Sequence, residues 1–192
     1  MIDLMRMTLR DPQAGFRVLR AKPWGPGDRW ALIFATAAAS AILSWLGMAL
    51  MPRAADGATL LGELVASPIS MASVQVASAA FGAYLLAEVG RIFGGSGRFA
   101  DALLAVGWIE AIMVLLQTVQ LAVTLILPPL GAIVGIATLL LAAYLMVALT
   151  MAVHGFRNPL LVVLGILGTV MLTSFLLSIL AATLGILPGA PA

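Results

Sequence analysis

The sequence predicts an all-α fold, an integral membrane bundle of five transmembrane helices preceded by a short amphipathic interfacial segment. Two observations predict it. The chain is 62% hydrophobic and 9% charged, whereas charged residues make up roughly a quarter of an ordinary soluble domain. From Arg29 to the C-terminus, four stretches of 23, 24, 43 and 35 residues contain no charged side chain. A helix needs about 20 apolar residues to cross the hydrocarbon core of a bilayer, so each stretch can hold at least one transmembrane helix.

The N-terminal segment is expected to lie on the membrane surface as one or two short helices. Ile2, Met5 and Leu9 recur at helical spacing, and Phe16 and Leu19 form an apolar face further along. A signal peptide is not expected, because basic residues interrupt the segment and leave no continuous apolar region. The predicted membrane-surface basic face consists of Arg6, Arg10, Arg17, Arg20 and Lys22. Such a face suits contact with anionic lipid headgroups.

Capping residues mark the start of the first two transmembrane helices. Asp28 is the type of residue that caps a helix N-terminus, and it directly precedes the first charge-free stretch. Ser67 stands before a proline, as Asp11 does in the N-terminal segment, and this pair is typical of a cap followed by the first helical residue. In the intervening loop, residues 59–66 are expected at the membrane interface. The two predicted spans are 29–51 and 68–88.

Glycine and proline separate the remaining helices. The glycine-rich turn at 94–97 is expected to be a flexible connection before the third helix. Pro128 and Pro129 divide the 43-residue stretch, because proline lacks an amide donor and disfavours helix in the residue before it. Gly155 is placed as a C-terminal cap, and Asn158 before a proline begins the last helix. The predicted spans are 101–127, 130–154 and 159–187, so the chain divides into the N-terminal segment 1–28, the five-helix domain 29–187 and a short tail 188–192.

The distribution of Lys and Arg predicts the orientation. Six lie in the first 29 residues, and Arg91, Arg98 and Arg157 lie in the loops on the same side, whereas Arg53 stands alone on the other side. Loops rich in Lys and Arg usually stay in the cytoplasm. We therefore expect a multi-pass protein of the inner (cytoplasmic) membrane, with a cytoplasmic N-terminus and a C-terminus outside.

Small residues indicate how the helices pack. Contact between helices in lipid depends on close backbone approach, because lipid tails are as apolar as the side chains. A compact bundle is therefore expected. The predicted packing residues are Gly131, Gly135, Gly165, Gly168, Ser78 and Gly82.

Glu110 is the one carboxylate placed well inside a predicted span. Gln117 and Gln120 follow on the same helix and project with it within an arc of about 80°, and Gln75 belongs to a weaker polar stripe on the second helix. Intramembrane carboxylates often serve proton or ion pathways, which makes this stripe a candidate transport site. We favour the alternative, a protonated Glu110 that is hydrogen-bonded between helices, because burial favours the uncharged acid and no basic partner is evident. A position near enough to the cytoplasmic surface for hydration is a further alternative.

The composition limits the possible chemistry. The chain has no cysteine and a single histidine, His154, which leaves no thiol nucleophile and few ligands for a metal site. At the end of the fourth span, His154 is expected to be a cation that complements the helix C-terminus. No nucleophile or acid pair is found, so neither an enzyme nor a cofactor is expected. Basic residues are not interleaved with aromatic ones, so no nucleic acid partner is expected.

Three short motifs resemble a known family. They are Asp11-Pro12 with Gly15-Phe16-Arg17, the turn Gly94-Gly95-Ser96-Gly97-Arg98-Phe99, and Ala105-Val106-Gly107-Trp108. With five spans, they are similar to the bacterial branch of the Yip-domain family, which is named for proteins that interact with Ypt/Rab GTPases. The resemblance implies a five-helix membrane domain with a cytoplasmic N-terminus and no catalytic centre. The chain departs from the family pattern at Trp108, where a tyrosine commonly follows the glycine, and at Ile109-Glu110, where a proline is often found.

Two functions are consistent with these observations. We favour a non-enzymatic membrane scaffold, adaptor or accessory subunit that binds a membrane or cytoplasmic protein partner. The expected partners are the lipid bilayer, anionic lipid at the N-terminal segment, and a protein partner or a second copy of the chain. The alternative is a small transporter or channel that uses Glu110, Gln117 and Gln120.

Overall fold

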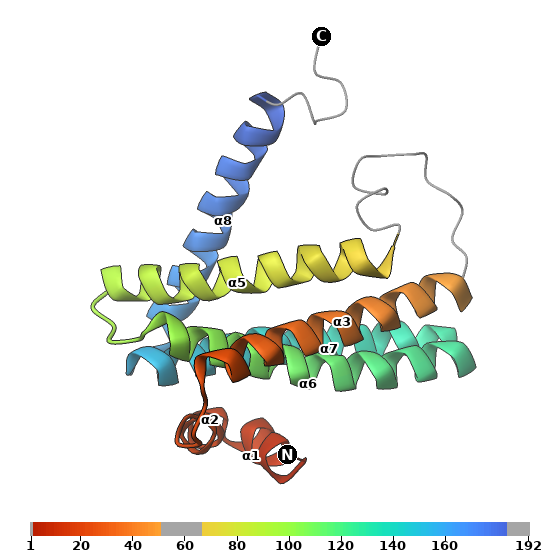
Figure 1. The fold of residues 1–192 in the computed structure, drawn as a ribbon, viewed down its shortest axis with the longest axis horizontal. Helices are drawn as coiled ribbons and strands as arrows, with labels where there is room; N and C mark the ends of the chain where they lie inside the picture. Colours follow the sequence, from red (N-terminus) through yellow and green to blue (C-terminus); the bar gives the residue numbers. More distant parts are fainter. Residues whose placement is uncertain (1, 51–66, 184–192) are drawn as a thin grey trace.

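The computed structural model describes residues 2–50 and 67–183, and helices account for most of them (Figure 1). The helices are α1 (Ile2–Arg10), α2 (Pro12–Arg20), α3 (Pro26–Leu50), α5 (Pro68–Ile92), α6 (Phe99–Ile126), α7 (Pro128–His154) and α8 (Pro159–Thr183). The predicted interfacial segment 59–66, the last residues of the predicted fifth span and the tail 188–192 lie outside the described residues.

Five of these helices, α3 and α5 to α8, are long and apolar enough to cross a membrane. The all-α fold with five candidate spans is therefore confirmed. The boundaries differ from those predicted by a few residues. The helix predicted from residue 29 begins at Pro26, since the Asp28 carboxylate accepts a hydrogen bond from the Gly25 N–H (2.8 Å) from within the first turn. Likewise α7 begins at Pro128, because proline is tolerated in the first turn of a helix.

Three of the predicted caps have the expected geometry. The Asp11 carboxylate accepts a hydrogen bond from the Ala14 N–H (2.9 Å), and the Ser67 hydroxyl accepts one from the Ser70 N–H (3.2 Å). Gly155 ends α7 with a φ of 75°, a left-handed conformation that costs glycine little. Local sequence thus fixes where these helices begin or end.

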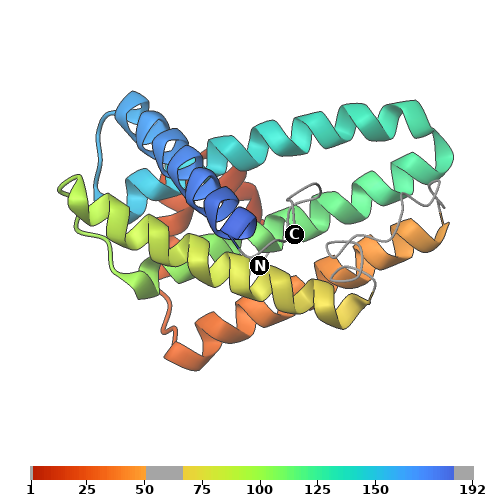
Figure 2. The same ribbon diagram turned by 90° about the horizontal axis from the view of Figure 1, so that it is seen from above.

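Helix α6 lies at the centre of the bundle, where it contacts α3, α5 and α7 (Figures 1 and 2). Helix α8 crosses over α5 and then leaves the bundle. We call the end at which α3 and α6 begin and α5 and α7 finish the proximal end. Helices α1 and α2 pack against the flank of the bundle near this end, mainly against α7 and α6.

The main hydrophobic core joins α1 and α2 to the proximal halves of α6 and α7. Phe16 and Leu19 are almost completely buried there, so this apolar face, expected to lie on the membrane surface, packs against α6 and α7 instead. In α1 the buried residues are Leu4 and Thr8, whereas Ile2 remains 75% exposed. The side of α1 that packs on the bundle therefore differs from the apolar face expected to meet the membrane, of which Ile2 and Leu9 remain exposed.

Candidate functional site

Gln117 forms a polar link between α6 and α3. Its side-chain oxygen accepts a hydrogen bond from the Ser40 hydroxyl (2.9 Å), and its amide nitrogen donates to the Ser44 hydroxyl (2.9 Å). Both the oxygen and the nitrogen of the Gln117 amide therefore form hydrogen bonds from α6 to α3. Such hydrogen bonds hold transmembrane helices together.

Gln120 turns toward α7 instead. Its amide nitrogen donates to the carbonyl of Gly131 (3.4 Å) and lies against Gly135. At Gly131 a Cβ atom would collide with Thr124, so the backbones of α6 and α7 approach closely there. The predicted stripe is thus divided between two helix interfaces. A rotation of about 60° between positions 117 and 120 is enough to change the neighbour, because α6 has helices on both sides.

Glu110 and Gln75 do not join these glutamines in one site. Glu110 is partly buried on α6, seven residues before Gln117, and Gln75 is partly buried on α5. Among residues 2–50 and 67–183, no ion pair reaches Glu110 and no group of three or more His, Cys, Asp or Glu side chains is placed to hold a metal ion. The structure therefore supplies interhelical links at Gln117 and Gln120, with Glu110 standing apart from them.

The other predicted packing residues are in open surroundings. A Cβ atom added at Gly82, Gly165 or Gly168 would meet no atom within 4 Å. Ser78 is exposed on α5. The close approach predicted at these four positions is not found, because α8 diverges from the bundle instead of packing along α5.

All five residues of the predicted basic face are exposed. One of them, Arg20, forms an ion pair with Asp101 at the start of α6 (2.9 Å), and the Asp101 side chain is only 8% exposed. This ion pair ties α2 to the bundle. The remaining members of the face are Arg6, Arg10, Arg17 and Lys22.

A buried hydrogen bond fixes α1 in the same region. The indole N–H of Trp108 donates to the hydroxyl oxygen of Thr8 (3.0 Å), and that hydroxyl donates to the Leu4 carbonyl (2.9 Å). Gly15 of α2 lies so close to Thr8 that a Cβ atom there would overlap it. The N-terminal helices are therefore docked on the bundle through polar groups as well as apolar ones.

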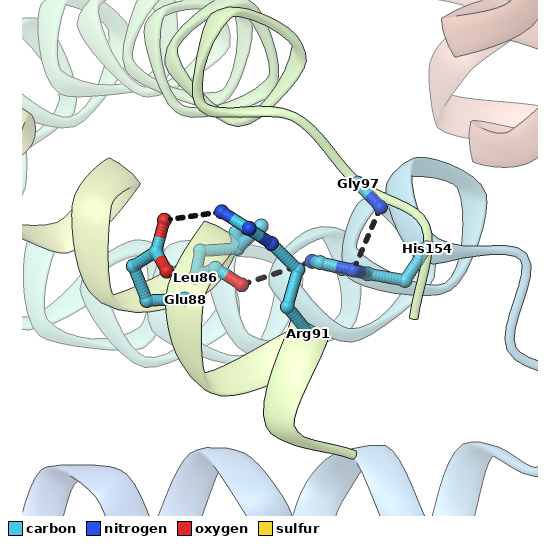
Figure 3. Close-up of polar contacts among 5 residues, drawn as sticks. All are labelled: Leu86, Glu88, Arg91, Gly97 and His154. Atoms are coloured by element: carbon cyan, nitrogen blue, oxygen red, sulfur yellow. Dashed lines mark hydrogen bonds and ion pairs between the residues drawn. The ribbon is translucent and has the colours of Figure 1, made fainter. Parts of the chain in front are cut away.

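His154 is the centre of a second buried site at the proximal end (Figure 3). It is the last residue of α7 and is 3% exposed. Its Nδ1 atom accepts a hydrogen bond from the Gly97 N–H (3.1 Å), and its Nε2 atom lies 2.9 Å from the Leu86 carbonyl oxygen of α5. One imidazole thus connects α5, the loop after it, and α7.

These partners determine the protonation state of the ring. A backbone N–H can only donate, so Nδ1 must carry no hydrogen, and a carbonyl can only accept, so Nε2 must carry one. The imidazole that satisfies both bonds is neutral. The cationic role expected for His154 is therefore wrong: a proton on Nδ1 would face the Gly97 N–H directly.

Three glycines make room for this ring. A Cβ atom at Gly90, Gly95 or Gly97 would overlap His154. Backbone bonds close the loop over it, from the Gly95 N–H to the Gly90 carbonyl (2.9 Å) and from the Ser96 N–H to the His154 carbonyl (3.3 Å). The turn was predicted to be a flexible connection, but it packs closely around the His154 ring.

The surroundings of His154 are apolar or internally paired. Phe156 stacks on the imidazole with ring centroids 5.3 Å apart. On the same end of α5, Arg91 is paired with Glu88 at 2.8 Å (Figure 3). No signal in the sequence brings this site together, because the glycines and the histidine are more than fifty residues apart.

The fold and its polar links define a multi-pass integral membrane protein with helices joined by hydrogen bonds. The sequence matches the Yip1 domain family over residues 7–180. Since this covers most of the chain, the protein belongs to that family, and the predicted resemblance is confirmed. Searches of curated proteins and of solved structures gave no match.

Proposed function

We propose that this protein is a non-enzymatic adaptor of the inner membrane of a cell, with a cytoplasmic N-terminus. Helices α1 and α2 hold a basic face at the proximal end, and a cytoplasmic protein with an acidic surface binds there. The observation that carries the proposal is the docking of α1 and α2. Their buried core, the Trp108–Thr8 hydrogen bond and the Arg20–Asp101 ion pair present the basic face in one arrangement.

The composition of the exposed surface supports this location. Helices α1 and α2 expose the apolar Ile2, Leu9 and Val18 beside the basic residues. A surface of this mixed kind suits the boundary between headgroups and water, where anionic lipid attracts the same cations. We propose that lipid headgroups border the face while the protein partner binds over it.

The polar residues of the spans favour an adaptor over a transporter. Gln117 and Gln120 form bonds to α3 and α7, so they serve cohesion between helices. A pathway would then depend on Glu110 alone. One carboxylate without a paired group is a poor basis for ion transport.

The adaptor is tested by purification from native membranes in a mild detergent. We expect a stoichiometric protein partner with the wild-type chain. The double variant Arg6→Gln/Arg17→Gln should lose that partner, because rim charges chiefly set electrostatic attraction. The control Arg91→Gln/Arg98→Gln removes the same charge from the end of α5 and from the loop after it, and should retain the partner.

Two outcomes would count against the proposal. Recovery of the wild-type chain without any stoichiometric protein would remove its basis. An ion flux in proteoliposomes that is lost in Glu110→Gln, while the variant stays folded, would establish the transporter instead.

A further inference from the structure

A groove of about 640 Å³ lies between α5, α7 and α8. Helix α8 crosses α5 and then leaves the bundle (Figures 1 and 2). The groove is within the usual volume range of sites for small molecules. Its walls include Leu85 and Val89 of α5, Met146 of α7, and Leu161 and Val170 of α8. The groove is partly open to its surroundings.

The interior of the groove offers no unpaired hydroxyl. Thr150 and Thr169 line it, but each hydroxyl donates to a carbonyl of its own helix, to Met146 (2.6 Å) and Gly165 (2.7 Å) respectively. Only the methyl groups of these two threonines remain for contact with a ligand. The walls therefore suit a hydrocarbon chain, which has no hydrogen-bonding group to satisfy.

Two glycines border the space. Gly82 and Gly165 line the groove from opposite helices, and a Cβ atom at either position would meet nothing within 4 Å. The concavity is therefore real open space between the helices.

The end of the groove next to the loop between α7 and α8 is polar. Arg157 and Asn158 line it there, and no acidic side chain belongs to its lining within the described part of the chain. The Asn158 side-chain oxygen accepts from the Leu160 N–H (3.0 Å), so its amino group is the part that can donate to a ligand. An anionic oxygen group complements this end, since arginine binds phosphate through paired N–H donors.

The groove is about as long as one acyl chain. Its lining extends along α8 from Asn158 to Val170, a rise of roughly 18 Å, and an acyl chain covers about 15 Å, half of the hydrocarbon core. A transmembrane helix from a second copy would need a groove about twice as long, roughly 30 Å.

We propose that the groove binds one acyl chain of an anionic phospholipid, with the phosphate at Arg157 and Asn158. The lipid would fill the space that separates α8 from α5. This site is separate from the basic face on α1 and α2, so either proposal can fail without the other.

The test uses the full chain in nanodiscs of phosphatidylcholine with a small fraction of phosphatidylglycerol that carries a photoactivatable group within its acyl chain. After irradiation, labelled peptides are identified by mass spectrometry. We expect labels on α5 and on the first half of α8, and competition by unlabelled phosphatidylglycerol but not by added phosphatidylcholine.

Matched variants locate the lipid. Gly165→Leu places a side chain in the groove and should abolish the labels there, whereas Gly168→Leu, on the same helix but outside the lining, should retain them. Arg157→Gln should weaken competition by phosphatidylglycerol about tenfold, the effect of losing one charge-assisted hydrogen bond. Arg98 lies outside the groove lining, so Arg98→Gln should leave the competition by phosphatidylglycerol unchanged.

Three results would overturn the proposal. Labels spread evenly over all lipid-facing helices would mean ordinary bilayer contact. Equal labelling of the Gly165→Leu and Gly168→Leu variants would exclude the groove. The chain has no cysteine, so a disulfide between two copies of Leu164→Cys, a groove residue, would show that a second copy occupies it.

Discussion

Helices α6 and α8 are both long and apolar, yet one is the centre of the bundle and the other is almost uncovered. Their mean hydropathies are 2.0 and 2.5, whereas 61% and 6% of their most apolar windows are buried. Helix α8 has one buried residue, Val162. Hydropathy thus predicts which segments enter a membrane and says little about how they pack.

The difference follows from where the polar groups bond. On α6, Asp101, Trp108 and Gln117 each bond to a residue of another helix. On α8, Thr169 and Ser178 donate to their own helix backbone. Lipid tails compete equally for apolar contact. Polar bonds to other helices, together with close packing, therefore decide which helix becomes central.

The strongest test replaces the same residue type in both helices. Leu104 of α6 is completely buried, and Leu172 of α8 is 59% exposed. We expect Leu104→Ala to lower the free energy of unfolding by about 2 kcal/mol or more, because a cavity remains in packed surroundings. Leu172→Ala should have little effect. Denaturant unfolding in mixed micelles measures both, and similar losses would contradict the burial of α6.

Sequence could predict the spans because charge-free length and helix caps are local signals. Asp11, Ser67 and Gly155 act at positions within a few residues of the groups that they cap. The membrane as solvent imposes these signals on each segment separately. This explains why the number of long helices and most of their boundaries followed from the sequence.

The sites could not be predicted in the same way, because they depend on contacts between distant segments. His154 is expected from the sequence to be a cation at a helix C-terminus, since it precedes a glycine at the end of a span. Only the fold shows that Gly90 and Gly97 surround its ring. Similarly, Gln117 and Gln120 were expected to face one interior, whereas α6 has two different neighbours at those positions.

A second test compares packed and open positions within α5. Gly90 faces the His154 ring, while Gly82 faces open space. Alanine improves helix propensity at both positions by up to about 1 kcal/mol. At Gly90 the added methyl group must displace the ring, at a cost of about 1–3 kcal/mol. We therefore expect Gly90→Ala to be less stable than Gly82→Ala, as measured by thermal unfolding in detergent.

The Gly90→Ala result also has a local readout. Displacement of the ring should expose the Gly97 amide, whose N–H donates to His154 in the wild-type chain. Hydrogen exchange at residue 97 should accelerate in this variant and stay unchanged in Gly82→Ala. Unchanged exchange in both would mean that the loop is not held by the histidine.

The smallest expected effect concerns the polar link between α6 and α3. Gln117→Leu removes the bonds to Ser40 and Ser44 and should lower the free energy of unfolding by about 0.6 kcal/mol, the average for hydrogen bonds between transmembrane helices. The loss is small because both serines can bond to their own helix backbone instead. Combining it with Ser44→Ala in a double-mutant cycle isolates the coupling. Thr169→Val on α8 should show no coupling to any other helix, and a coupling as large as that of Gln117 would remove the distinction between the two helices.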